Sequence, residues 1–193
     1  MVWGSIDVGA SFLNIPESLR SISGRMNAEG YQVDAVDSDY YTDKIKPILE
    51  PFYREFELDK LLADDLAELM PVSDYLSWFN QIPDRVTAPI NEYWGTADKG
   101  FMVVEREGKN YFVIPRIRNG NLLVMRQPPR SDDKDEDQRI YHKGTVPMNH
   151  FYLAAYFYAR TYWESDALIH LGTHGSQEYL SGNCLLYTSD AAD

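Results

Sequence analysis

Cysteine is almost absent from this sequence: Cys184 is the only one among 193 residues. A single thiol excludes an internal disulfide and a thiolate metal cluster. Basic residues are also scarce, with 18 Lys and Arg against 30 Asp and Glu, which gives a net charge of −12. Because so acidic a chain is not attracted to nucleic acid or to an anionic membrane surface, we expect neither as a partner.

Long hydrophobic runs are missing too. A helix that spans a bilayer needs about 20 apolar residues, and no segment approaches that length. The start of the chain lacks the basic stretch and apolar run of a secretory leader, so the expected compartment is the cytoplasm. Neither G-x-x-x-x-G-K-[ST] nor G-x-G-x-x-G occurs, so the chain is not expected to hydrolyse ATP by itself. A G-x-S-x-G nucleophile elbow is also absent.

Residues 1–39 have the pattern of one α/β unit. Asn14 is a suitable N-cap, and Pro16 fits the first turn of a helix, where a missing N–H has no cost. Gly30 predicts the end of that helix, and residues 31–33 then alternate like a short strand.

Residues 40–100 are expected to be mainly helical. Leucines at helical spacing predict an amphipathic helix over 58–70, with acidic residues on the opposite face. Shorter helices are expected over 75–79 and 86–94, because prolines separate these segments.

Residues 101–183 are predicted to begin as a strand meander. Apolar runs at 101–104 and 111–114 flank a glycine-containing turn, which predicts a hairpin. Asn119-Gly120 predicts a second tight turn, and the prolines after Gln127 end the strand pairing.

The remainder of that segment is predicted to form a second α/β unit. Aromatic residues lie nearly all round a helix over 148–164, so this helix should be buried on most sides. A short strand over 167–171, a glycine loop and another helix follow. The whole pattern predicts an α/β fold: parallel-sheet α/β elements with a helical insertion and a short strand meander.

All four histidines lie between residues 142 and 174. In α/β folds, the loops that follow the carboxyl ends of parallel strands bind ligands. His174 lies in such a predicted loop, His170 lies at the end of the predicted strand, and Glu178 lies in the first turn of the next helix.

Three interpretations of these residues compete. A helical H-x-x-x-H zinc-protease site is rejected, because Leu171 stands where the catalytic glutamate would be and Gly172 interrupts the helix. Two interpretations remain nearly equal: a structural role for the histidines, and a functional cluster in which imidazoles and the Glu178 carboxylate converge on a ligand at a helix N-terminus.

Several blocks, in the right order, resemble one family. Residues 170–180 read HLGTHGSQEYL, which resembles the CobN/magnesium-chelatase large-subunit family. The upstream blocks that also resemble it are residues 13–19 with Gly30-Tyr31, Gly120-Asn121, the QPPR segment at 127–130, and the block that contains His142, Pro147, His150 and Tyr152.

The resemblance implies the tetrapyrrole-binding large subunit of an ATP-dependent, ligase-type metal chelatase. The wording of the last block favours cobalt insertion into hydrogenobyrinic acid a,c-diamide in cobalamin biosynthesis. The alternatives are magnesium insertion into protoporphyrin IX, or a binding fragment without turnover. A generic metal-dependent hydrolase is a further rival. In the family, separate AAA+ subunits hydrolyse the ATP.

The resemblance also implies roles for individual residues. His174 and Glu178 would be catalytic, and both would bind the incoming metal together with His170. Tyr156 would pack on the macrocycle, and Arg130 would pair with a substrate carboxylate. The residues expected to bind the tetrapyrrole are His170, His142, His150, Arg130 and Tyr152.

Two departures qualify the match. Family members are several times longer, so the chain is expected to be an internal fragment of a multidomain protein. Residues 181–183 read SGN where the family has Pro-Gly-Lys, and residues 184–193 match nothing in the family, so this tail is expected to be foreign.

Overall fold

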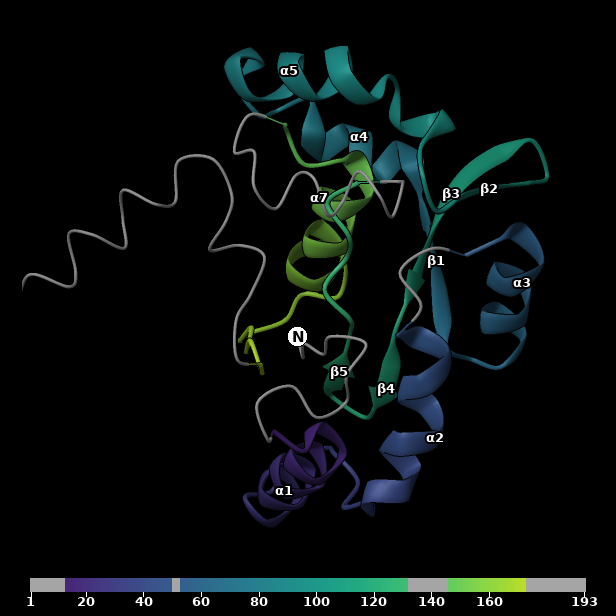
Figure 1. Cartoon of the computed structure of the whole chain (residues 1–193). Helices are drawn as coiled ribbons and strands as arrows, with labels where there is room; N and C mark the ends of the chain where they lie inside the picture. The colour runs from purple at the N-terminus through teal and green to yellow at the C-terminus, as the bar shows by residue number, and fades with distance from the viewer. Residues whose placement is uncertain (1–12, 50–52, 132–145, 173–193) are drawn as a thin grey trace, which may run out of the picture.

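The computed structural model describes residues 13–49, 53–131 and 146–172 (Figure 1). Helix α1 (Ile15–Ala28) begins as predicted, because the Asn14 side chain accepts a hydrogen bond from the Glu17 N–H at 3.1 Å. Gly30 follows the helix at φ +87°. Helix α2 (Ser38–Ile48) is capped in the same way by Asp37.

Residues 31–33 were expected to form a strand and do not. The Gln32 carbonyl accepts one hydrogen bond, from the Asn121 N–H at 2.7 Å. The Asn119 side chain accepts from the Asp34 N–H at 3.0 Å and donates to the Asp34 carbonyl at 2.9 Å. This segment is therefore held by the turn of a hairpin, which offers no strand edge for a ladder.

Two antiparallel sheets form the centre of the chain. The first has the order β1-β3-β2, from β1 (Ala67–Pro71), β2 (Val103–Arg106) and β3 (Lys109–Pro115). The second pairs β4 (Ile117–Asn119) with β5 (Leu122–Val124). Both predicted hairpins are confirmed.

The helix predicted over 58–70 was wrong beyond residue 63. Helix α3 (Glu55–Ala63) ends before Asp65, which has φ +54°, and β1 follows. Strand β1 pairs antiparallel with β3, in the register Leu69↔Val113. A partner strand at least 40 positions away therefore overrides the local helical spacing of the leucines.

The mixed α/β class is confirmed, but the parallel sheet is not, since both sheets of the described ranges are antiparallel. Residues 167–171 were expected to form a strand and are irregular in the structure. Leu168 and Ile169 are exposed there, at 41% and 57%. No strand within the described ranges pairs with this segment, so it gains no ladder hydrogen bonds there.

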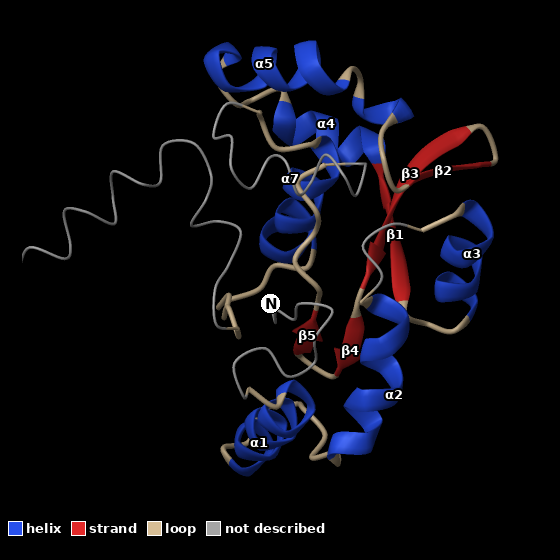
Figure 2. Cartoon of the chain, in the orientation of Figure 1, coloured by secondary structure: helices blue, strands red, loops and turns tan. Residues whose placement is uncertain are grey.

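Helices lie on both sides of the three-stranded sheet. In Figure 2, α3 and α7 (His150–Phe157) flank the red strands, while α4 (Val72–Phe79) and α5 (Asp84–Trp94) lie beyond one end. A short 3₁₀ helix, η2 (Ala97–Lys99), follows α5. The predicted aromatic helix is confirmed over α7 and continues as a π-helix, η3 (Tyr158–Tyr162). Within the described ranges, no helix is both long and apolar enough to cross a membrane.

Aromatic side chains fill the core between α4, α7 and the sheet. Tyr75 stacks on Phe79 with ring centroids 5.4 Å apart and meets Phe112 edge-on at 5.3 Å. Trp78 stacks on Phe157 at 5.1 Å. Helix α7 therefore packs against a layer of aromatic rings.

Candidate functional site

The start of α7 joins two of the sequence blocks. The Asn149 side chain caps the helix by accepting from the Tyr152 N–H at 2.7 Å. Its amide also donates to the Pro129 carbonyl at 3.3 Å, and its backbone N–H donates to the Arg130 carbonyl at 3.3 Å. The QPPR segment is thus fixed to the N-terminus of α7, and Asn149 is 3% exposed.

His150 lies beneath this junction and is 3% exposed. Its Nε2 lies 3.0 Å from the Gly95 carbonyl, which can only accept, so Nε2 carries the hydrogen. Nδ1 then accepts from the Tyr75 hydroxyl at 2.9 Å. Burial lowers the pKa of His150, although the hydrogen bond to Gly95 opposes this shift. His150 is therefore a neutral imidazole with both nitrogens engaged within the protein.

Four residues form a second group, which we call the Gln127 cluster: Gln127, Tyr152, Tyr156 and His170. Gln127 Nε2 donates to the Tyr152 hydroxyl at 2.7 Å and to the Tyr156 hydroxyl at 3.3 Å. The rings of Tyr152 and Tyr156 lie 5.2 Å apart. Beyond them, the His170 ring lies 6.3 Å from that of Tyr156, with 26° between the planes. The cluster presents neighbouring flat rings backed by a buried amide.

The predicted site residues that the structure describes lie either at the start of α7 or in the Gln127 cluster. Tyr152 and Arg130 are each 2% exposed, so both are buried, whereas His170 is exposed. Desolvation lowers the pKa of the His170 imidazole. His142, His174 and Glu178 lie outside the described residues.

Three residues were predicted from the sequence to bind the metal, and His170 is the one among them that the structure describes. Among the described residues, no group of three His, Cys, Asp or Glu side chains can hold a metal ion. Gln127 was missed as a site residue. The signal for it was available, because it is the first residue of the QPPR block.

A hollow lies against the same segment. It is lined by residues that include Tyr53, Met102, Met125, Pro128, Phe151 and Ala155. This lining is mostly apolar, so it suits an apolar group. Residues 125–129 thus contact both the hollow and, through Gln127, the aromatic rings of the Gln127 cluster.

Comparisons with known proteins identify the family of the chain. The CobN/Magnesium Chelatase family model matches residues 4–191, a range that includes most of the tail expected to be foreign. The aerobic cobaltochelatase subunit CobN of Pseudomonas aeruginosa is 30% identical over 92% of the chain and 13% of that protein. The chloroplastic magnesium-chelatase subunit ChlH of Oryza sativa subsp. japonica is 25% identical over 90% of the chain and 12% of that protein.

A solved structure also matches. The catalytic subunit of cobaltochelatase from Mycobacterium tuberculosis superposes with a TM-score of 0.68 and 28% identity, over 87% of this chain and 14% of that one. The chain therefore belongs to the CobN/magnesium chelatase family. It spans roughly an eighth of the length of the curated relatives that it matches.

Proposed function

We propose that this chain is part of the tetrapyrrole-binding large subunit of a cobaltochelatase, a ligase-type enzyme that inserts cobalt into hydrogenobyrinic acid a,c-diamide for cobalamin biosynthesis. The match to the family model over residues 4–191 carries the proposal. Cobalt is favoured over magnesium because the identity is 30% to a CobN and 25% to a ChlH.

The chemistry requires a metal ligand and a base. A divalent ion that enters the macrocycle takes the place of the protons on its inner nitrogens, so a base must accept each proton that leaves. Imidazole and carboxylate both suit cobalt, and neutral imidazole is a base of suitable strength near neutral pH. We assign the catalytic roles to His174 and Glu178. We propose that these two residues also bind the metal ion, with His170 as the third ligand.

The Gln127 cluster supports the substrate side of this proposal. A planar macrocycle packs well on flat rings, and Tyr156 and His170 offer two rings 26° apart in plane. Tyr152 is buried and its ring lies 5.2 Å from that of Tyr156, so we propose that it supports that ring. His150 is proposed to act indirectly, by fixing the start of α7 through Tyr75 and Gly95. His142 is proposed to line the site. Arg130 is proposed to pair with a carboxylate of the macrocycle through its planar guanidinium.

The energy source is proposed to lie in partner subunits. No phosphate-binding loop occurs in the sequence, and the family assigns ATP hydrolysis to AAA+ subunits. We therefore expect insertion to require both the full-length subunit and its ATPase partners.

The test separates binding from insertion. The full-length subunit is titrated with the tetrapyrrole, read by visible absorbance, and cobalt insertion is then measured with the ATPase subunits and ATP. In Glu178→Gln, tetrapyrrole binding should persist while insertion falls at least about 100-fold, as for loss of a general acid–base group. Glu107→Gln, an exposed hairpin residue, is the matched control. Unchanged insertion by Glu178→Gln refutes the assigned role.

The same assay distinguishes the two metals. Magnesium with protoporphyrin IX is offered in place of cobalt with the corrinoid precursor. Turnover of the magnesium pair alone supports the alternative indicated by the likeness to ChlH. Binding without insertion of either ion supports a binding module.

A further inference from the structure

We propose that Tyr158, held by Glu68 and Arg116, is a positioning residue that sets the place of His170 in the site. This inference rests on the proposed function, because it assigns a purpose to His170 that only the chelatase reaction makes measurable. It is carried by a polar cluster around the buried side chains of Arg116 and Tyr158, and by the π-helix that begins at Tyr158 and precedes His170 in the chain.

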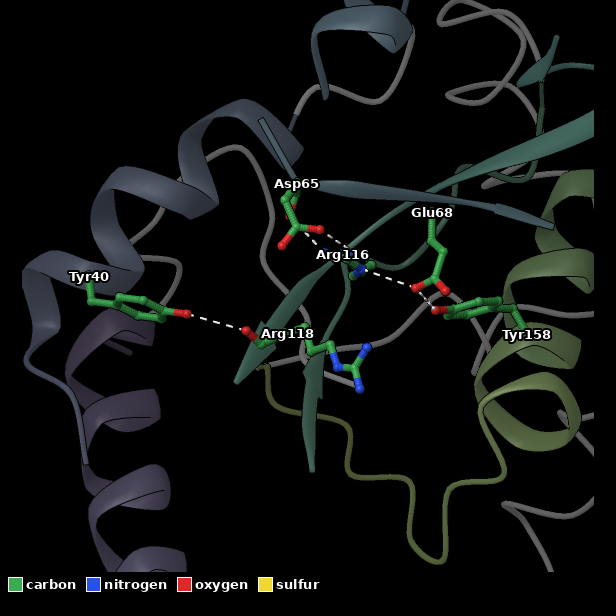
Figure 3. Close-up of polar contacts among 6 residues, drawn as sticks. All are labelled: Tyr40, Asp65, Glu68, Arg116, Arg118 and Tyr158. Atoms are coloured by element: carbon green, nitrogen blue, oxygen red, sulfur yellow. Dashed lines mark hydrogen bonds and ion pairs between the residues drawn. The ribbon is translucent and has the colours of Figure 1, made fainter. Parts of the chain in front are cut away.

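The polar cluster surrounds the Arg116 guanidinium, whose side chain is 6% exposed. Nη1 donates to the Asp65 carbonyl at 2.6 Å, and Nη2 donates to the Asp65 carboxylate at 2.7 Å. Nε donates to Glu68 Oε2 at 3.4 Å. Figure 3 shows that the Tyr158 hydroxyl points at the same carboxylate, and it donates to Glu68 Oε2 at 2.7 Å.

The pKa values of Arg116 and Tyr158 are both raised by their surroundings. Burial lowers the pKa of Arg116, but Asp65 and Glu68 outweigh that effect and raise it overall. Burial, followed by the bond to Glu68, raises the pKa of Tyr158. The Tyr158 hydroxyl therefore remains a donor throughout the physiological range. Tyr158 is 0% exposed, so its ring has no room to swing away.

Tyr158 also begins the π-helix η3. Its carbonyl accepts from the Trp163 N–H at 2.7 Å, which closes an i→i+5 turn. The chain then reverses at Glu164, which has φ +56°, and the Ser165 N–H donates to the Ala159 carbonyl at 3.2 Å. Further along this segment, the His170 ring faces that of Tyr156, with the centroids 6.3 Å apart.

The hydrogen bond between Tyr158 and Glu68 affects the position of His170 through the π-helix. An isolated π turn is rare and is found frequently at functional sites. If the turn relaxes to α-helical bonding, each residue after it is rotated by about 100° about the helix axis, because an α-helix has about 3.6 residues per turn. Two side chains oppose this relaxation. Tyr158 is tied to β1 through Glu68, and the Arg118 guanidinium lies 4.7 Å from the centroid of the Trp163 ring.

A double-mutant cycle in the full-length subunit tests the inference. Tyr158→Phe removes only the hydroxyl, and Tyr162→Phe makes the same change at an exposed position of the same π-helix. Each is measured alone and with His170→Ala, by the kcat of cobalt insertion with the ATPase subunits. We expect Tyr158→Phe to lower kcat about tenfold, less than the roughly 100-fold that a 1 Å misplacement can cost. Tyr162→Phe should change kcat less than twofold.

The cycle separates positioning from general destabilisation. If Tyr158 acts through His170, Tyr158→Phe changes kcat less than twofold in the His170→Ala background, since coupled residues are not additive. A tenfold loss in both backgrounds overturns the inference, and so does no loss in either. If His170→Ala alone leaves insertion unchanged, the role of His170 in the proposed function fails instead. Glu68→Gln retains an acceptor oxygen for the Tyr158 hydroxyl, so it should lower kcat less than Tyr158→Phe does. If Tyr158→Phe does not fold, the same cycle is measured with Glu68→Gln.

Discussion

Replacing Gly120 with alanine tests how the N-terminal segment is attached to the rest of the chain. Gly120 opens the turn between β4 and β5 at φ +57°, a conformation that glycine adopts without strain. A Cβ built at this position lies 2.0 Å from the Gln32 carbonyl oxygen, which belongs to the backbone. The segment around Gln32 must therefore move away from the hairpin in the variant.

The size of the effect follows from two contributions. Alanine in the left-handed region costs about 1–2 kcal/mol, and the reduced freedom of the unfolded chain offsets about 0.4–1 kcal/mol of that. Moving Gln32 away also weakens its 2.7 Å hydrogen bond with Asn121 and the paired bonds between Asn119 and Asp34. Each bond contributes about 1 kcal/mol. With partial relaxation, we expect a loss of about 3 kcal/mol.

Gly108→Ala is the matched control. Gly108 has φ +72°, but nothing lies within 4 Å of a Cβ built there. The control should lose about 1 kcal/mol, because only the backbone contribution applies. Thermal unfolding followed by circular dichroism measures both variants. A difference of about 2 kcal/mol corresponds to a Tm lower by roughly 4–8 °C for Gly120→Ala. Equal Tm values for the two variants would show that the close approach at Gln32 contributes nothing to stability.

Three further predictions concern the start of α7 and the buried arginine. Asn149→Ala should cost about 1–2 kcal/mol in denaturant unfolding, more than Asn14→Ala, because the Asn149 cap is buried and also holds the QPPR segment; equal losses contradict this. Burial lowers the pKa of His150, so the unfolded chain takes up a proton first as pH falls below about 6.5. The free energy of unfolding should therefore fall between pH 7 and 5.5, with a weaker fall in His150→Gln; parallel curves would rule out this linkage. Arg116→Lys should lower the free energy of unfolding by about 1 kcal/mol although the charge is kept, because lysine lacks the planar fork that reaches Asp65 and Glu68. A Tm equal to that of the unchanged chain would disprove this.

The predicted site was partly accessible from the sequence. The QPPR block at 127–130 and the block that contains Pro147, His150 and Tyr152 are separate in sequence, yet Asn149 joins them in the structure. Their order indicated the family, but not that Asn149 makes the junction. The burial of His150 was also not predictable, because the sequence pattern of a histidine at a helix start does not depend on what its side chain contacts. In the structure its contacts are Tyr75 and the Gly95 carbonyl.

The sequence by itself determined those elements whose hydrogen bonds form between residues close together in the chain. The Asn14 cap fixes the start of α1, and the glycine turns at Gly108 and Gly120 fix two hairpins, because each feature is satisfied within a few residues of chain. The tertiary structure alone decided that residues 67–71 form a strand, since the partner in β3 lies far along the chain. It also decided that residues 167–171 do not form one, because a strand requires a neighbour whose N–H and C=O groups complete its own.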